Sequence, residues 1–248
     1  MASNNFPMAN WEEDELENPV GHTAWVLNSL TNELTVRGTI ETTDRENPPW
    51  NAFKDDIESA ALLDGVESIC DGAFNGCWRM KSVHIPGTLT SLGKAAFNYC
   101  RGLISVTIPN SVGAIGRIAF SNCTSLTSLI FPDSVETIGD YALNGCTSLT
   151  SVTISNSSKY LGEKAFNACH CLTTIAIPDS VMHIGKEAFS SCYALTSITI
   201  PGSVETLGAD VFSQCTNLTK VRVVGDGDLK MIDGVLFDTD MTRLVWFS

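Results

Sequence analysis

The sequence contains little charge and no long hydrophobic run. Aspartate, glutamate, lysine and arginine make up 17% of the 248 residues. No segment approaches the ~18 consecutive apolar residues that a membrane-spanning helix needs, so we expect no insertion into a membrane. The first residues, Met1 to Phe6, also lack the basic and apolar regions of a secretory signal. Either the protein stays where it is made, or a signal has been removed.

The charge that is present is mostly acidic. The formal net charge is −13 and the sequence pI is about 4.6. An acidic chain repels the phosphates of nucleic acids and of anionic membrane surfaces, so neither is an expected partner. Hydrophobic residues make up 44% of the sequence, which is enough to bury a sizeable core.

Motifs of catalysis and of metal binding are also missing. No histidine stands beside a serine or cysteine in a nucleophile motif, and neither GxSxG, HExxH nor a phosphate-binding loop occurs. Clusters of the CxxC type, which zinc sites use, do not occur either. We therefore expect no enzymatic activity, no cofactor and no metal, and interpret the histidines as surface variation: His22, His84, His170 and His183.

An internal repeat of 23 residues dominates the sequence. Cysteine recurs at this interval without a slip, at positions 77, 100, 123, 146, 169, 192 and 215. Three residues before each cysteine lies an aromatic residue or, once, a leucine: Phe74, Phe97, Phe120, Leu143, Phe166, Phe189 and Phe212. Several independent columns in one register indicate a solenoid of about eight coils.

Each repeat unit predicts one coil. In residues 103–108 the alternation places Val106 and Ile108 inward, and Pro109 then ends the strand. Residues 117–122 are expected to form a short helical or 3-10 turn on the return side. Since no coil can bury its apolar face alone, stacking should pair the strands into a parallel sheet.

This pattern resembles the BspA-like class of leucine-rich repeats, from about Ile57 to Val223. The resemblance rests on the motif Ser-Val-x-Ile-Pro-x-Ser-Val-x-x-Ile-Gly-x-x-Ala-Phe-x-x-Cys. It implies a parallel sheet on a concave face, short turns on the convex side and small capping elements at both ends. It also implies adhesion or protein binding at a microbial cell surface or after secretion. A cytoplasmic location is the alternative.

The repeat register divides the chain into four segments. Residues 1–19, which contain an acidic run, are predicted to be disordered. Residues 20–56 should form an N-terminal cap made of a hairpin and a short helix. The solenoid should occupy residues 57–224. Residues 225–248 should form either a hairpin cap or a truncated continuation of the array.

The cysteines have three possible interpretations. A buried column of small apolar thiols is the favoured one. Disulfides between neighbouring coils, or a metal site, are the alternatives. The total is nine, counting Cys70 and Cys171, so one thiol at least is free or pairs with another chain.

The outward strand positions are the candidate binding site. Solenoids commonly bind through such a face, and here it should take a protein or glycan partner. The alternative function is a structural spacer in a longer array, without a ligand of its own. The candidate residues are Lys81, His84, Ser105, Thr107, Ser128, Ile130, Ser151, Thr153, Thr174, Thr199, Lys220 and Arg222.

Overall fold

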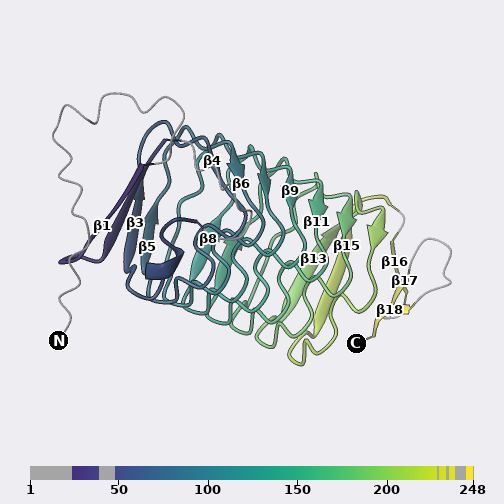
Figure 1. Ribbon diagram of the computed structural model, residues 1–248. Helices are drawn as coiled ribbons and strands as arrows, with labels where there is room; N and C mark the ends of the chain where they lie inside the picture. Colours follow the sequence, from purple (N-terminus) through teal and green to yellow (C-terminus); the bar gives the residue numbers. More distant parts are fainter. Residues whose placement is uncertain (1–23, 39–47, 228, 233–234, 238–243, 248) are drawn as a thin grey trace.

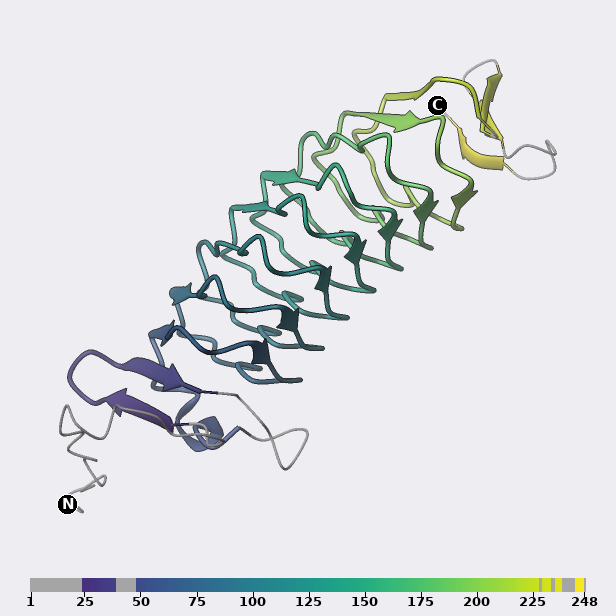
Figure 2. The same cartoon turned by 90° about the horizontal axis from the view of Figure 1, so that it is seen from above.

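The protein is a solenoid of stacked 23-residue coils. The computed structural model describes residues 24–38, 48–227, 229–232, 235–237 and 244–247. Figures 1 and 2 show the coils stacked along one axis, with a hairpin at the N-terminal end and short strands at the C-terminal end. The stack bends little along its axis in either figure.

One line of strands runs along the face predicted from the repeat. Neighbouring strands in this line are parallel and offset by 23 residues, so that Val152 lies beside Leu129 and Ile198 beside Val221. The strands are β3 (Ser59–Leu62), β5 (Ser82–His84), β8 (Ser128–Ile130), β10 (Ser151–Thr153), β13 (Ser197–Pro201) and β15 (Lys220–Val224).

The ladder of this line is incomplete in two coils. Residues 103–109 lack strand pairing, although Val106 and Ile108 are buried as predicted. In the coil of residues 172–178 only Ala176 forms isolated bridges, with Thr153 on one side and Thr199 on the other. The inward and outward positions therefore keep their register even where the strand is absent.

A second line of strands closes the other side of each coil. It forms one seven-stranded sheet in the order β14-β12-β11-β9-β7-β6-β4. Each strand directs one Ile or Leu inward, and this residue is buried in all of them except β14, whose Leu207 is partly buried. The strands are β4 (Ser68–Ile69), β6 (Ser91–Leu92), β7 (Ala114–Ile115), β9 (Thr137–Ile138), β11 (Tyr160–Leu161), β12 (His183–Ile184) and β14 (Thr206–Leu207).

The corner that follows corrects one detail of the prediction. Residues 117–122 form successive turns, not a helix, because Ile118 and Asn122 adopt left-handed φ angles of 62° and 59°. This conformation points alternate N–H groups at the next coil, and the Phe120 N–H donates to the Ala142 carbonyl at 2.8 Å. A helix would have kept these donors within its own segment. The corner thus contributes a third line of hydrogen bonds between coils.

The N-terminal hairpin extends the strand face. Strands β1 (Ala24–Asn28) and β2 (Glu33–Arg37) are antiparallel, and β2 then pairs in parallel with β3. The short 3-10 helix η2 (Asn51–Phe53) follows Trp50, whose buried ring stacks on Phe74 with 5.6 Å between centroids. The Trp50 indole N–H donates to the Ala73 carbonyl at 2.8 Å. The first coil is therefore covered by an aromatic side chain.

At the C-terminal end three strands form an antiparallel sheet in the order β16-β17-β18. Their bounds are β16 (Lys230–Ile232), β17 (Val235–Phe237) and β18 (Leu244–Phe247). The segment between β17 and β18 lies outside the described residues, as does the acidic N-terminal segment. The predicted boundaries of both caps stay predictions.

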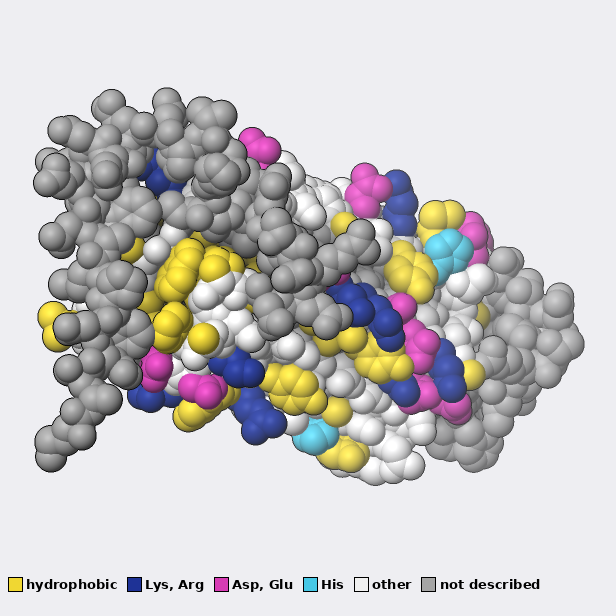
Figure 3. Space-filling view, in the orientation of Figure 1, with side chains coloured by type: hydrophobic (Ala, Val, Ile, Leu, Met, Phe, Trp, Pro, Cys, Tyr) yellow, Lys and Arg dark blue, Asp and Glu magenta, His cyan; other side chains and the backbone are white. Residues whose placement is uncertain are grey.

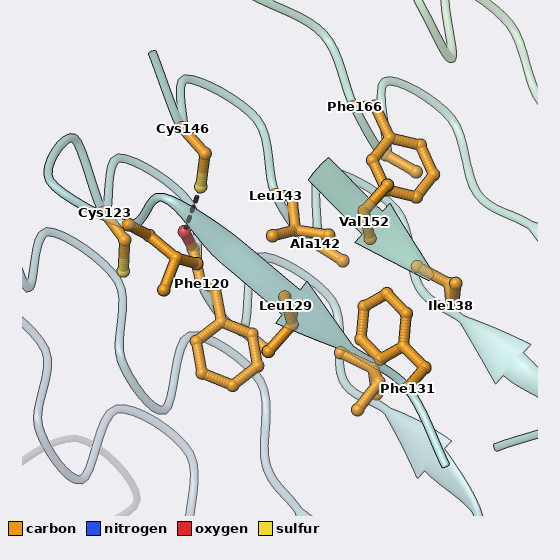
Figure 4. Packing of buried hydrophobic residues seen from close by; sticks show 14 of the residues in the cluster. Phe120, Cys123, Leu129, Phe131, Ile138, Ala142, Leu143, Cys146, Val152 and Phe166 are labelled. Atoms are coloured by element: carbon orange, nitrogen blue, oxygen red, sulfur yellow. Dashed lines mark hydrogen bonds between the residues drawn. The ribbon is translucent and has the colours of Figure 1, made fainter. Parts of the chain in front are cut away.

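The core is a set of straight columns with one irregular coil. In that coil Leu143 replaces the usual Phe, while Phe131 replaces the usual Ile of the strand column. Both side chains are buried, and Figure 4 shows both directed into the packed interior. The coil has therefore exchanged a large and a small side chain between its two sides. Its total side-chain volume is nearly conserved, which cores tolerate well.

This exchange predicts a strong coupling between the two positions. Leu143→Phe alone should overpack the coil and cost about 1–3 kcal/mol. Phe131→Ile alone should leave a cavity. The double variant should cost at least about 1 kcal/mol less than the sum of the single variants, measured by chemical denaturation. Phe131→Ile combined with the distant Ile200→Val is the control and should be additive. If the losses in unfolding free energy were additive in both double variants, the two positions would not compensate each other in volume.

Candidate functional site

The candidate site on the strand face is formed by the outward residues of the first strand line. Parallel pairing places Ser128 beside Ser151, and Ile130 beside Thr153. In the same way Thr199 lies beside Arg222. All twelve predicted residues are exposed, and Ile130 is 67% exposed. The coil stacking therefore presents them on one surface, with eleven in two neighbouring columns and Lys81 one residue before the first column.

The side chains in the middle of this face are small and uncharged, and its basic side chains lie at the two ends. Serine and threonine hydroxyls occupy most positions from Ser105 to Thr199, whereas Lys81 and His84 lie at one end and Lys220 and Arg222 at the other. Hydroxyl groups without an adjacent base are weak nucleophiles. The described residues contain no group of three or more His, Cys, Asp or Glu that could hold a metal ion. The arrangement suits contact with a flat partner.

The cysteine column lies inside the solenoid. Its hydrogen bonds to the previous coil explain why cysteine recurs at this position. From Cys100 onward, each thiol of the column donates to the carbonyl of the phenylalanine, or leucine, one coil and three residues earlier. Figure 4 shows this bond from Cys146 to the carbonyl of Phe120, at 3.2 Å. The same bond joins Cys123 to Phe97 and Cys192 to Phe166. A cysteine is small enough to fit there and still provides a donor toward the previous coil.

Most thiols of this column are chemically quiet. The exception is the partly buried Cys215, where a hydrogen bond with Cys192 lowers the pKa. Burial raises the pKa of Cys146 to about 12 and the pKa of Cys100 well above its ordinary value. Thiols of such pKa stay protonated at neutral pH, and a protonated thiol is a poor nucleophile and metal ligand. The seven thiols of the column form no disulfide, and Cys171, which lies outside the column, is exposed. The column therefore serves packing.

A second group of exposed side chains was missed by sequence reasoning. Trp78, Tyr99 and Ile104 are 51%, 43% and 52% exposed and lie in the turns that lead into the strand face. They stand outside the outward strand columns, which were the only positions that the repeat marked as surface. Figure 3 shows hydrophobic and basic side chains next to one another along the lower edge of this side of the molecule. One signal was available: no Asp or Glu occurs between Asp71 and Asp133.

Stacked parallel coils with inward columns of Leu, Ile and Phe define a leucine-rich-repeat solenoid. A sequence profile described as a BspA type leucine rich repeat region matches six copies, over residues 50–169 and 136–241. The chain belongs to this BspA-type leucine-rich repeat family. No curated protein sequence matches the chain.

Solved structures support the same assignment. The chain is similar to a leucine rich cell surface protein from Faecalibacterium prausnitzii, with 26% identity, a TM-score of 0.50 and 71% of this chain covered. It spans 62% of the length of that protein. A leucine-rich repeat protein from Bacteroides ovatus has 19% identity and a TM-score of 0.55, over 84% of this chain and 76% of its own. The second likeness shows the fold alone.

No helix in the described part of the chain has the length and apolar character needed to cross a membrane.

Proposed function

We propose that the chain is a non-catalytic binding module of a microbial cell-surface protein, and that its strand face binds a protein or glycan partner. The observation that supports this proposal is the exposure of all twelve candidate residues, eleven of them in two aligned columns. A solenoid held by three lines of hydrogen bonds keeps such columns in place, so little order has to be gained on binding. The similarity to a leucine rich cell surface protein supports the location.

A second candidate function is that of a spacer in a longer array. The observation that favours it is the chemistry of the middle of the face. Side chains from Ser105 to Thr199 are mostly small hydroxyls, and tight interfaces generally contain Trp, Tyr or Arg anchors. A spacer would keep the same fold and would bind nothing through this face.

The test compares two variants of equal charge. The face variant carries His84→Glu, Thr107→Glu, Ile130→Glu and Thr153→Glu. The control variant carries Ser91→Glu, Ala114→Glu, Thr137→Glu and Thr206→Glu on the second strand line. Both are screened against purified matrix proteins and a glycan array after circular dichroism has shown that they fold.

We expect a partner that binds the wild-type chain and the control variant but binds the face variant at least tenfold more weakly. Four added carboxylates at the contact would both clash with the partner and need desolvation. Equal binding by both variants would place the site elsewhere. Binding by none of the three proteins would support the spacer.

A further inference from the structure

The acidic chain contains one block that has only basic charge. Between Asp71 and Asp133 there is no Asp or Glu, although the chain as a whole has a formal net charge of −13. The same block carries Arg79, Lys81, Lys94, Arg101 and Arg117. Since the block spans consecutive coils of a solenoid, cations at equivalent places of neighbouring coils lie close in space.

The turns of two adjacent coils bring part of this block together. The Gly102 N–H donates to the Trp78 carbonyl at 2.9 Å, and the Ile104 N–H donates to the Lys81 carbonyl at 3.1 Å. A Cβ atom at Gly102 would lie 2.9 Å from the Trp78 carbonyl oxygen, so the glycine permits this close approach. We call the resulting surface the basic edge: Trp78, Arg79, Lys81, Tyr99, Arg101 and Ile104.

The side chains of the basic edge are exposed and stacked on one another. The Arg79 guanidinium lies 5.8 Å from the centroid of the Trp78 ring, and the Arg101 guanidinium lies 5.5 Å from that of Tyr99. The Trp78 indole N–H is held by the Asp55 carboxylate at 2.8 Å. Tryptophan, tyrosine and arginine are the residues that contribute most to protein interfaces, and here they are already ordered.

The positive charge of the basic edge is only partly neutralised. Glu58 pairs with both Arg79, at 2.6 Å, and Lys81, at 2.7 Å. Lys81 and then Arg79 lower the pKa of Glu58, so this carboxylate stays charged, but it serves two cations. In the part of the chain that the structure describes, no carboxylate forms an ion pair with Arg101. A ligand of the basic edge should therefore bring several carboxylates, together with apolar side chains for Trp78, Tyr99 and Ile104.

The sequence contains one segment with this composition. Residues 11–17 read Trp-Glu-Glu-Asp-Glu-Leu-Glu, which combines five carboxylates with Trp11 and Leu16. We propose that the basic edge is the docking site of residues 11–17 of the same chain. This contact goes beyond the proposed function, because it lies on the turns beside the strand face and needs no external partner.

The segment can reach the basic edge. Strand β5 is three strand positions from β1, which is about 15 Å at the usual spacing between strands. Lys81 also lies about five residues, or 17 Å, back along the strand direction from the level of Ala24. The direct path is then about 22 Å, and the seven residue steps from Glu17 to Ala24 span up to about 24 Å. Tethering at this length gives an effective concentration in the mM range, which favours the same chain over a second copy.

Carbodiimide cross-linking tests the contact directly, since it joins a carboxylate to a lysine amine only when the two touch. The full chain is treated at low micromolar concentration, and linked peptides are quantified by mass spectrometry. Lys81 is the reporter, and Lys159, of similar side-chain exposure (62% and 59%) and also paired with a glutamate, is the matched control. We expect links from residues 12–17 to Lys81 at least fivefold more often than to Lys159.

Two variants separate a specific contact from general attraction. Arg79→Gln with Arg101→Gln leaves Lys81 in place and should reduce the yield of the Lys81 link at least threefold. Replacing the five tail carboxylates by their amides should expose the basic edge, so that a labelled peptide of residues 10–18 binds this variant at least tenfold more tightly than the wild-type chain. This second measurement leaves every solenoid residue unchanged.

Three results would overturn the proposal. Equal linking to Lys81 and Lys159 would show that the tail has no preferred site. A link yield that rises with protein concentration would assign the contact to a second copy. Equal binding of the peptide to the wild-type and tail-neutralised chains would show that the tail does not cover the basic edge. Lys81 belongs to both surfaces, but the four substitutions that test the strand face leave it unchanged, so the proposed function would stand or fall separately.

Discussion

Replacing Phe97 with alanine should lower the free energy of unfolding by about 3–5 kcal/mol. The Phe97 ring is fully buried between two others, with centroids 5.2 Å from Phe74 and 5.4 Å from Phe120. The interplanar angles are 2° and 4°, so the rings are parallel and offset-stacked. Removal would leave a cavity that the coils on both sides cannot fill, because their backbones are fixed by the hydrogen bonds of the corner.

Phe120→Ala provides the comparison within the same column. Phe120 stacks on Phe97 on one side but faces the coil of Leu143 on the other, so its removal breaks one ring contact instead of two. We expect it to cost less than Phe97→Ala by about 0.5–1.5 kcal/mol, the value of one aromatic pair. Guanidinium denaturation followed by circular dichroism measures both. Equal losses would show that burial alone, without ring stacking, determines stability in this column.

Most of the fold could be predicted because each coil repeats the same set of inward residues. A buried Val or Ile in one coil implies buried residues 23 positions away, so one correct assignment fixes a whole column. The corner turns could not be predicted in the same way. Their left-handed positions are occupied by residues such as Ile118 and Lys164, which have no local preference for that conformation. Hydrogen bonds to the next coil impose it, and these depend on stacking.

The candidate sites also differ in how far the sequence predicts them. The strand face was predictable, since alternation along a strand determines which side chains face outward. The basic edge was not, because turn residues follow no such alternation, and Trp78 and Arg101 differ from their equivalents in other coils. Trp50 is a related case: it stacks on Phe74 but lies 24 residues before it, outside the 23-residue register. Contacts between residues that are not 23 positions apart cannot be predicted from the repeat pattern.

The glycine column carries the second prediction of large effect. Gly162 has an ordinary negative φ, so conformational freedom does not explain it. A Cβ atom at this position would lie 2.4 Å from the amide nitrogen of Asp140 and 2.5 Å from the carbonyl carbon of Gly139. The obstructing atoms are backbone of the previous coil, which cannot rotate away as a side chain would. Gly139, Gly185 and Gly208 meet the same kind of obstruction.

Gly162→Ala should therefore destabilise the chain by at least about 1–3 kcal/mol, the usual cost of overpacking. Relief of the clash requires the two coils to separate locally, and this weakens the bond from the Gly162 N–H to the Ile138 carbonyl, now 2.8 Å. Gly87→Ala is the matched control, because nothing lies within 4 Å of its added Cβ. The control should be neutral or stabilising by up to about 1 kcal/mol, through a less flexible unfolded chain. Similar midpoints of urea denaturation for the two variants would mean that the coils can separate at little cost, and that their close approach is not what the glycine column maintains.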